Sequence, residues 1–268
     1  GQADGAGVRF LHGGSVVNQS SGTIDGGYGI SNNGGTAGLS VVNAGTISGT
    51  TAAVQLASGV ANRVVASSGA VFVGKVDGGN TVGALASSTL ELTSTGSAGT
   101  LASLGSQFTH FANITVDSGA TWTLTSDTIG AGYTIVDSGT LTNAGSIGSV
   151  VTLAGSGSLT NTSTGTVSST GTAAVFSTSA SVGAIQNAGL ITDSNGFGRA
   201  INLRAGGSVN NTASGTIVSN YTGVYIRTGA GTVVNAGKID LGIDGTSGMR
   251  AGRGGALGNG SNGVVVGS

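Results

Sequence analysis

The stretch Val41-Val42-Asn43-Ala44-Gly45-Thr46-Ile47 decides the fold, because it returns along the chain at a nearly constant interval. Three copies keep its length, and they read Leu141–Ile147, Ile185–Ile191 and Val233–Ile239. A longer form carries two extra residues before the glycine, and it reads Val16–Ile24, Leu159–Val167 and Val209–Ile217. A motif that recurs in this way indicates a repeat protein, in which each unit buries its apolar side against its neighbours.

The spacing of the asparagines measures the repeat. Asn161 is followed by three further copies at intervals of 26, 24 and 24 residues, and Asn18 and Asn43 are 25 apart. We call each repeat of about 24 residues one coil. A chain of 268 residues has room for about eleven such coils.

The asparagines themselves are predicted to point inward at a corner. The residue two positions earlier is always Val, Leu or Ile, and positions two apart share one face of a strand. Amides stacked at successive corners can hydrogen-bond to the coil above and below, which satisfies them when buried. We call these residues the corner asparagines, and they are Asn18, Asn43, Asn143, Asn161, Asn187, Asn211 and Asn235.

A further strand follows each corner motif, and it begins with a small residue before an inward aliphatic one. The four clearest copies are Ala53–Leu56, Ala174–Phe176, Ala200–Leu203 and Gly223–Ile226. One coil therefore consists of a corner strand, a Gly-Thr-Ile strand and an Ala-Val-x-Leu strand. This pattern predicts an all-β fold, a single-stranded parallel β-helix or β-solenoid.

Composition supports a folded solenoid and excludes several classes. Glycine supplies 54 residues and proline none, which suits a chain whose backbone N–H groups are nearly all ladder donors. The nine basic and ten acidic residues are scattered, so nucleic-acid binding is not expected. No apolar run is long enough for a transmembrane helix. The absence of cysteine removes disulfides, thiol catalysis and cysteine metal sites.

We predict one domain over residues 1–268, with regular and irregular parts. Residues 1–14 are expected to be a frayed first coil, 15–60 regular coils, and 61–135 irregular coils without the asparagine corner. Within the irregular part, residues 101–113 are expected to form a bulge or side loop. Residues 136–241 are the regular half, and 242–268 are a glycine-rich loop with a last Ala-Val-x-Leu-like strand.

The repeats resemble the passenger domains of autotransporter adhesins, the type V secreted bacterial proteins. The resemblance rests on the Val-x-Asn-x-Gly-x-Ile coils and on intervening segments such as 69–79 and 116–124. It covers nearly the whole chain and implies a right-handed parallel β-helix exposed on a bacterial surface. No signal peptide is visible at Gly1 and no translocator pattern follows, so we expect a passenger or part of one.

Val-Asp-Ser-Gly, at residues 116 and 136, is superficially similar to the Gly-Asp-Ser-Gly of serine proteases. It occurs twice, about one repeat apart, which is typical of a structural motif. A protease also needs a base positioned by a third group, and the only histidines are His12 and His110. We therefore do not expect a protease.

Carboxylates are the other candidates for chemistry, since parallel β-helices also host polysaccharide lyases and hydrolases. Asp117 and Asp137 could lie one coil apart and serve a glycosidase, although Asp before Ser-Gly is also good chemistry for a solvated turn. Residues 240–245 contain too few oxygen ligands for calcium. The sequence predicts no cofactor and no metal site.

Tyr221, Tyr225 and Arg227 form the densest aromatic and cationic group in the sequence. Aromatic faces suit sugar rings, so these residues are candidates for contact with a glycan.

The sequence favours a non-enzymatic protein of the bacterial surface or extracellular space. We expect it to act as a stalk, an adhesion surface or a surface for self-association, with a glycan or protein of a host or bacterium as partner. One alternative is a subunit that stacks end to end into an extracellular filament, because solenoid ends present unpaired edges. A second alternative is a polysaccharide-active β-helix enzyme.

Overall fold

The computed structural model describes residues 5–125, 128–241, 249–250, 256–259 and 264–265. All the regular elements in these ranges are β-strands, and successive coils pair in parallel, as in β19 with β22 and β22 with β25. Pairing of Asn187 with Asn211, and of Asn211 with Asn235, sets about 24 residues per coil. The predicted all-β parallel solenoid is therefore confirmed, and the hand of its winding stays a prediction.

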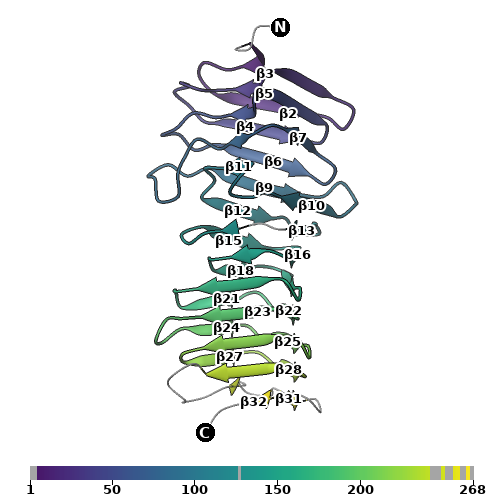
Figure 1. Ribbon diagram of the computed structural model, residues 1–268, viewed down its shortest axis with the longest axis vertical. Helices are drawn as coiled ribbons and strands as arrows, with labels where there is room; N and C mark the ends of the chain where they lie inside the picture. The colour runs from purple at the N-terminus through teal and green to yellow at the C-terminus, as the bar shows by residue number, and fades with distance from the viewer. Residues whose placement is uncertain (1–4, 126–127, 242–248, 251–255, 260–263, 266–268) are drawn as a thin grey trace. The chain divides into compact units, whose positions relative to one another are not determined.

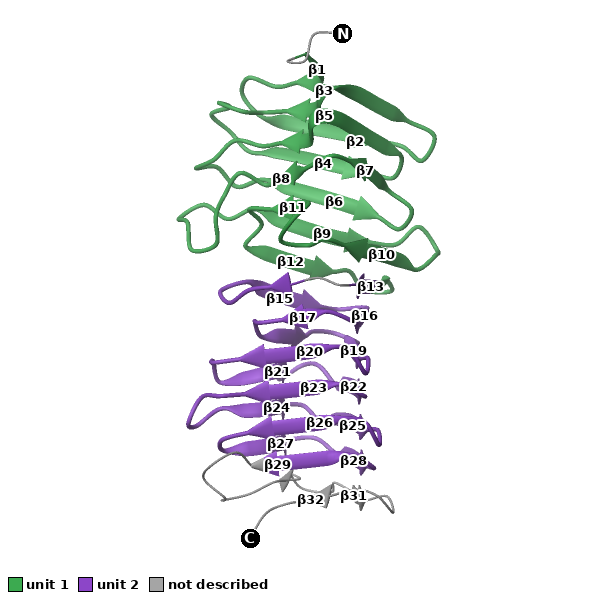
Figure 2. Cartoon of the chain, in the orientation of Figure 1, with its two compact units in different colours: residues 1–122 green, residues 123–268 purple. Residues whose placement is uncertain are grey.

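The chain forms two compact units, residues 1–122 and residues 123–268, which Figure 2 draws in green and purple. Within each unit the strands of successive coils lie side by side like steps (Figure 1). The single domain expected over residues 1–268 stays a prediction.

Unit 1 contains two parallel ladders. The first consists of β1 (Ala6–Arg9), β3 (Thr23–Ser31), β5 (Thr46–Gln55), β8 (Val76–Asp77) and β11 (Phe108–Thr109), with β7 (Val71–Val73) also paired to β5. The second consists of β2 (Gly14–Asn18), β4 (Leu39–Asn43), β6 (Arg63–Ser67), β9 (Thr89–Thr93) and β12 (Asn113–Val116). Residues 6–9 lie in the segment expected to be frayed, yet they form β1 and pair with β3.

The first coils of unit 1 differ from the predicted three-strand coil. The Gly-Thr-Ile strand and the Ala-Val-x-Leu strand run together as one long strand, β5, and β3 is its counterpart. Glycines make this continuous path possible. A Cβ at Gly49 would lie closer than 3 Å to the Ala52 carbonyl, so the chain can bend there only without a side chain.

The asparagine corner is lost in the later coils of unit 1, as the sequence predicted. The register places Asn43 opposite Ala66, then Ala66 opposite Leu92 and Leu92 opposite Val116. The side loop expected at residues 101–113 is wrong for its aromatic residues. Phe108 and Phe111 are buried in the core of the unit, because β11 pairs with β8 and draws this segment inward.

Two further strands of the chain are β10 (Gly99–Ala102) and β13 (Thr121–Thr125). Unit 2 then has three ladders of parallel strands. The corner ladder contains β16 (Thr140–Asn143), β19 (Ser158–Asn161), β22 (Gly183–Asn187), β25 (Gly207–Asn211), β28 (Gly231–Asn235) and β31 (Ala256–Asn259). The Gly-Thr-Ile ladder contains β14 (Thr128–Ile129), β17 (Ser146–Ile147), β20 (Thr166–Ser169), β23 (Leu190–Asp193), β26 (Thr216–Ser219), β29 (Lys238–Leu241) and β32 (Val264–Val265). The Ala-Val-x-Leu ladder contains β15 (Thr134–Asp137), β18 (Val151–Leu153), β21 (Ala173–Ser177), β24 (Arg199–Leu203), β27 (Thr222–Ile226) and β30 (Met249–Arg250).

The core of unit 2 consists of columns of aliphatic side chains. One column runs in register through Leu141, Leu159, Ile185, Val209 and Val233, each of them buried. Burying one such side chain contributes about 1.5–3 kcal/mol to folding. Because the same position recurs in every coil, the columns make successive coils stabilise one another.

The last strand belongs to a different ladder from the one expected. Val264 and Val265 pair with Lys238 and Ile239 of the Gly-Thr-Ile ladder, whereas the sequence suggested another Ala-Val-x-Leu strand. Most of the predicted glycine-rich loop, residues 242–248, 251–255 and 260–263, lies outside the described residues.

Candidate functional site

The corner asparagines of unit 2 form a ladder of buried amides. The Nδ2 of each donates to the Oδ1 of the next, at 2.9 Å from Asn143 to Asn161, 2.8 Å from Asn161 to Asn187, 2.8 Å from Asn187 to Asn211 and 2.7 Å from Asn211 to Asn235. All five side chains are buried. The ladder therefore connects five successive coils through polar groups that have no access to water.

Each amide also holds the backbone at its own corner and in the next coil. The Asn211 Nδ2 lies 3.2 Å from the Gly215 carbonyl oxygen and 3.1 Å from the Lys238 carbonyl oxygen. The Gly215 carbonyl also accepts the Lys238 backbone N–H at 2.9 Å, so the amide adds a second donor to a carbonyl that already joins two coils. The described geometry gives the corner asparagines a structural role.

The glycine of the motif is required by close packing against the ladder. A Cβ at Gly215 would lie closer than 3 Å to both the Asn211 Oδ1 and the Asn187 carbonyl oxygen. Gly189 and Gly237 are equally close to backbone oxygens of the preceding coil. In both the short and the long form of the motif, the glycine therefore packs against corner oxygens that leave no room for a side chain.

Unit 1 has a short version of the ladder. The Asn18 Nδ2 donates to the Asn43 Oδ1 at 2.8 Å, and the Asn43 Nδ2 donates to the Val71 carbonyl at 3.2 Å. The ladder ends there because the next coil has Ala66 at the corner.

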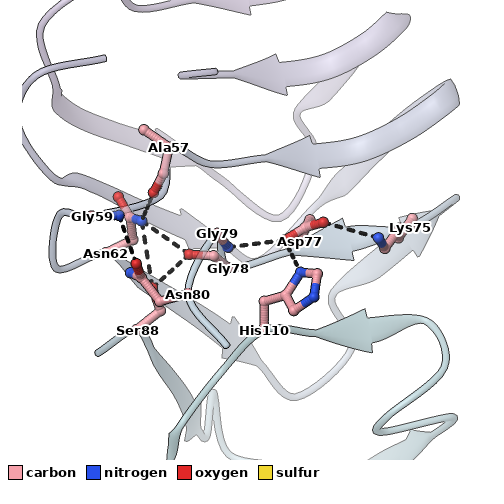
Figure 3. Close-up of polar contacts among 10 residues, drawn as sticks. All are labelled: Ala57, Gly59, Asn62, Lys75, Asp77, Gly78, Gly79, Asn80, Ser88 and His110. Carbon is pink, nitrogen blue, oxygen red and sulfur yellow. Dashed lines mark hydrogen bonds and ion pairs between the residues drawn. The ribbon is translucent and has the colours of Figure 1, made fainter. Parts of the chain in front are cut away.

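A second buried polar cluster takes over in the irregular coils of unit 1, as Figure 3 shows. The Asn62 Nδ2 donates to the Ala57 carbonyl at 2.8 Å and the Gly78 carbonyl at 2.9 Å. The Asn80 Nδ2 donates to the Ser88 Oγ at 2.8 Å. The cluster joins the segment between β5 and β6 to the segment between β8 and β9, and it does not follow the corner motif.

Asp77 forms the charged part of this region (Figure 3). Its carboxylate accepts from the Lys75 Nζ at 2.9 Å, the His110 Nδ1 at 2.7 Å and the Gly79 backbone N–H at 2.9 Å. Burial alone would raise the pKa of Asp77, but the hydrogen bonds from Lys75, His110 and Gly79 outweigh burial and lower it. Asp77 is therefore a fixed anion that ties β8 to the turn that follows β11.

The Asp77–His110 pair is not part of a catalytic triad in the described residues. A triad needs a hydroxyl hydrogen-bonded to the second imidazole nitrogen. Within the described part of the chain, no serine or threonine hydroxyl bonds to His110, and His12 bonds only to the exposed Thr36 hydroxyl. The arrangement therefore offers no activated nucleophile.

Asp117, one of the two predicted carboxylates, lies beside Glu91 and Arg63. Arg63 binds Glu91 through two hydrogen bonds of 2.8 and 2.6 Å. Burial raises the pKa of Asp117, and the charge of the nearby Glu91 raises it further. Asp117 and Asp137 belong to different compact units, so the pairing of these two carboxylates stays a prediction.

Asp137, the other predicted carboxylate, belongs to unit 2 and is fully buried. Its Oδ1 accepts from the Gly139 N–H at 3.0 Å, while its Oδ2 has no hydrogen-bond partner. Burial raises the pKa of Asp137 to about 7, and the pKa of Asp193, buried in the same unit, to about 6. The expectation of a solvated turn residue is wrong for Asp137, because its side chain points into the core.

The aromatic candidates Tyr221 and Tyr225 gather around Arg199 rather than Arg227. The Arg199 guanidinium lies 4.5 Å from the Tyr225 ring centroid and 5.5 Å from that of Tyr221. The Phe197 ring packs edge-on against Tyr221 at 6.3 Å. Arg227 is exposed after the end of β27 and makes no ring contact in the described residues.

The group extends across the outer face of the Ala-Val-x-Leu ladder. Phe176, Asn202 and Tyr225 are register neighbours on β21, β24 and β27, and the Arg204 guanidinium lies 5.6 Å from the Phe176 ring. We call this surface the aromatic–arginine patch, and it consists of Phe176, Phe197, Arg199, Arg204, Tyr221 and Tyr225.

Sequence reasoning missed parts of both sites, although a signal existed for one of them. Phe176, Asn202 and Tyr225 all occupy the x position of the Ala-Val-x-Leu strand, so aligning the repeats reveals the column. The cluster around Asn62 and Asn80 has no such signal, because its members follow no shared spacing.

Comparisons with known proteins give no family. No family model, no curated protein and no solved structure matches the chain. Among the described residues, no group of three or more His, Asp or Glu side chains could hold a metal ion, and no helix is long and apolar enough to cross a membrane.

Proposed function

We propose that this chain is a non-enzymatic β-solenoid of a secreted or surface-exposed bacterial protein, similar to a passenger segment of an autotransporter adhesin. It would act as a rigid scaffold that presents its outer faces for adhesion or self-association. The resemblance of its coils to such passengers supports the cellular location, and the patch of unit 2 supports the adhesive role.

One contrast carries this proposal. The polar side chains inside the solenoid bond to one another, whereas aromatic and arginine side chains lie together on an outer face. The corner asparagines and Asp77 make their hydrogen bonds within the protein, and these bonds hold the coils together. The aromatic–arginine patch, in contrast, includes Phe197, whose side chain is 82% exposed. Exposed aromatic rings beside arginines are typical of binding surfaces, where these residue types supply much of the affinity.

The proposal is tested by immobilising the purified chain and measuring capture from a panel of polysaccharides and extracellular matrix proteins. Adhesion predicts saturable binding of at least one class and unchanged polysaccharide chain length after incubation. Shortened polysaccharide would instead favour the enzyme alternative, and absence of any capture would refute adhesion.

Self-association is tested separately, by negative-stain electron microscopy over a series of protein concentrations. Particles that stay separate would restrict the role to a scaffold or adhesin. Long uniform fibres would instead favour the filament alternative.

A further inference from the structure

The aromatic–arginine patch is a continuous surface with two charged ends. Arg199 begins β24 and Arg204 follows its last residue, and between them the outer face presents the column of Phe176, Asn202 and Tyr225. Each guanidinium lies over one ring of this column, Arg199 over Tyr225 at 4.5 Å and Arg204 over Phe176 at 5.6 Å.

The arginines of the patch have no carboxylate partner in the described part of the chain. Among the described residues of unit 2, the ion pair is Lys238 with Asp240, on β29. The other two described acids of the unit, Asp137 and Asp193, are buried. An arginine with no internal partner is free to bind an anion from outside, and its planar fork matches a carboxylate or sulfate.

We propose that the aromatic–arginine patch binds an acidic glycan, a proposal that rests on the adhesive function proposed above. Sugar rings stack on the exposed Phe197 and on the neighbouring Tyr221, and the anionic substituent pairs with Arg199 or Arg204. The anionic group is a uronic acid carboxylate or a sulfate ester, since the same guanidinium chemistry recognises both.

The proposal is tested by isothermal titration of the whole chain with three tetrasaccharides, one of galacturonic acid, one sulfated and one neutral. Both charged probes, or one of them, should bind at least about tenfold more tightly than the neutral probe, and their affinity should fall with added salt. The charged probe that binds better identifies the substituent. Equal binding of charged and neutral probes would overturn the proposal.

Variants locate the site. Phe197→Ala and Arg199→Gln should each weaken binding of the better charged probe by about tenfold. Phe197 is so exposed that its removal should leave the melting temperature unchanged, which keeps the test valid if Arg199→Gln destabilises the fold. Arg199→Lys should bind with intermediate affinity, because it keeps the charge and loses the fork.

Matched controls are Arg9→Gln in unit 1, which removes the same charge, and Tyr133→Ala in unit 2, which removes an aromatic ring outside the patch. Both should bind like the unchanged chain. If the patch variants bind equally well while the immobilised chain still captures polysaccharide, the patch proposal fails and the adhesive function stands. Tighter binding of a single-stranded oligonucleotide than of any sugar would also overturn the proposal.

Discussion

The neighbouring residues Asn210 and Asn211 allow a direct test of the asparagine ladder. Both are asparagines on β25, but Asn211 is fully buried at the corner while Asn210 faces solvent. We predict that Asn211→Ala strongly destabilises unit 2 and that Asn210→Ala has almost no effect. The two substitutions remove the same atoms, so the difference between them isolates the buried position.

The size of the effect follows from the hydrogen bonds. The Asn211 amide faces three acceptors, at 3.2, 2.7 and 3.1 Å, and its Oδ1 accepts from the Asn187 Nδ2 at 2.8 Å. An amide has two hydrogens, so these contacts count as about three full bonds, each contributing about 1 kcal/mol net. Buried partners left without a bond add to this cost. The expected loss in free energy of unfolding is about 3–5 kcal/mol.

The measurement is urea unfolding followed by circular dichroism, together with hydrogen exchange of the amides in β22, β25 and β28. Exchange is needed because a solenoid can lose coils locally. Asn211→Asp is the third variant to be measured. It keeps the shape but points a carboxylate at acceptor oxygens, so it should be less stable than Asn211→Ala at neutral pH. Equal stability of Asn210→Ala and Asn211→Ala would refute the reasoning.

Four further predictions concern the core, the corner glycines and the buried acids. Ile201→Asp places an unpaired charge in the core and should unfold several coils. An unchanged melting temperature would contradict the assignment of Ile201 to the inward face. Gly215→Ala should lower the melting temperature because its Cβ meets the corner oxygens, whereas Gly196→Ala, which meets nothing within 4 Å, should not. Because the folded pKa of Asp137 is raised to about 7, stability should fall as pH rises from about 4 to about 7, and Asp137→Asn should remove that component in urea titrations at several pH values. The pKa of Asp77 is lowered, so the destabilisation by Asp77→Asn should be present at neutral pH and should vanish as pH falls below about 4, which the same titrations measure.

Much of the regular half of the chain could be predicted because its signals are local and repeated. An aliphatic residue two positions before each asparagine identifies the inward face, and the 24-residue interval identifies the stacking. The position of Asn259 shows the strength of this rule. It lies opposite Asn235 in the register, 24 residues later, and the same spacing would have found it.

The irregular coils could not be predicted to the same depth, because their interactions join residues without a common spacing. Phe108 and Phe111 were expected in a loop, but pairing of β11 with β8 buries them. Asp77 and His110 are 33 residues apart, which is no multiple of the repeat, and their contact depends on the path of the intervening turns.

The sequence by itself determined the β-solenoid, the length of a coil and the identity of the corner asparagines. Those properties follow from a period of two within strands and a period of about 24 between them, which physical chemistry converts directly into a face and a register. Only the tertiary structure decided which polar groups bond within the protein and which stay exposed to a ligand. It turned Asp137 into the core, joined Asp77 to His110 and placed Arg199 between two tyrosines. These outcomes depend on the distances between side chains of different coils, which no single repeat contains.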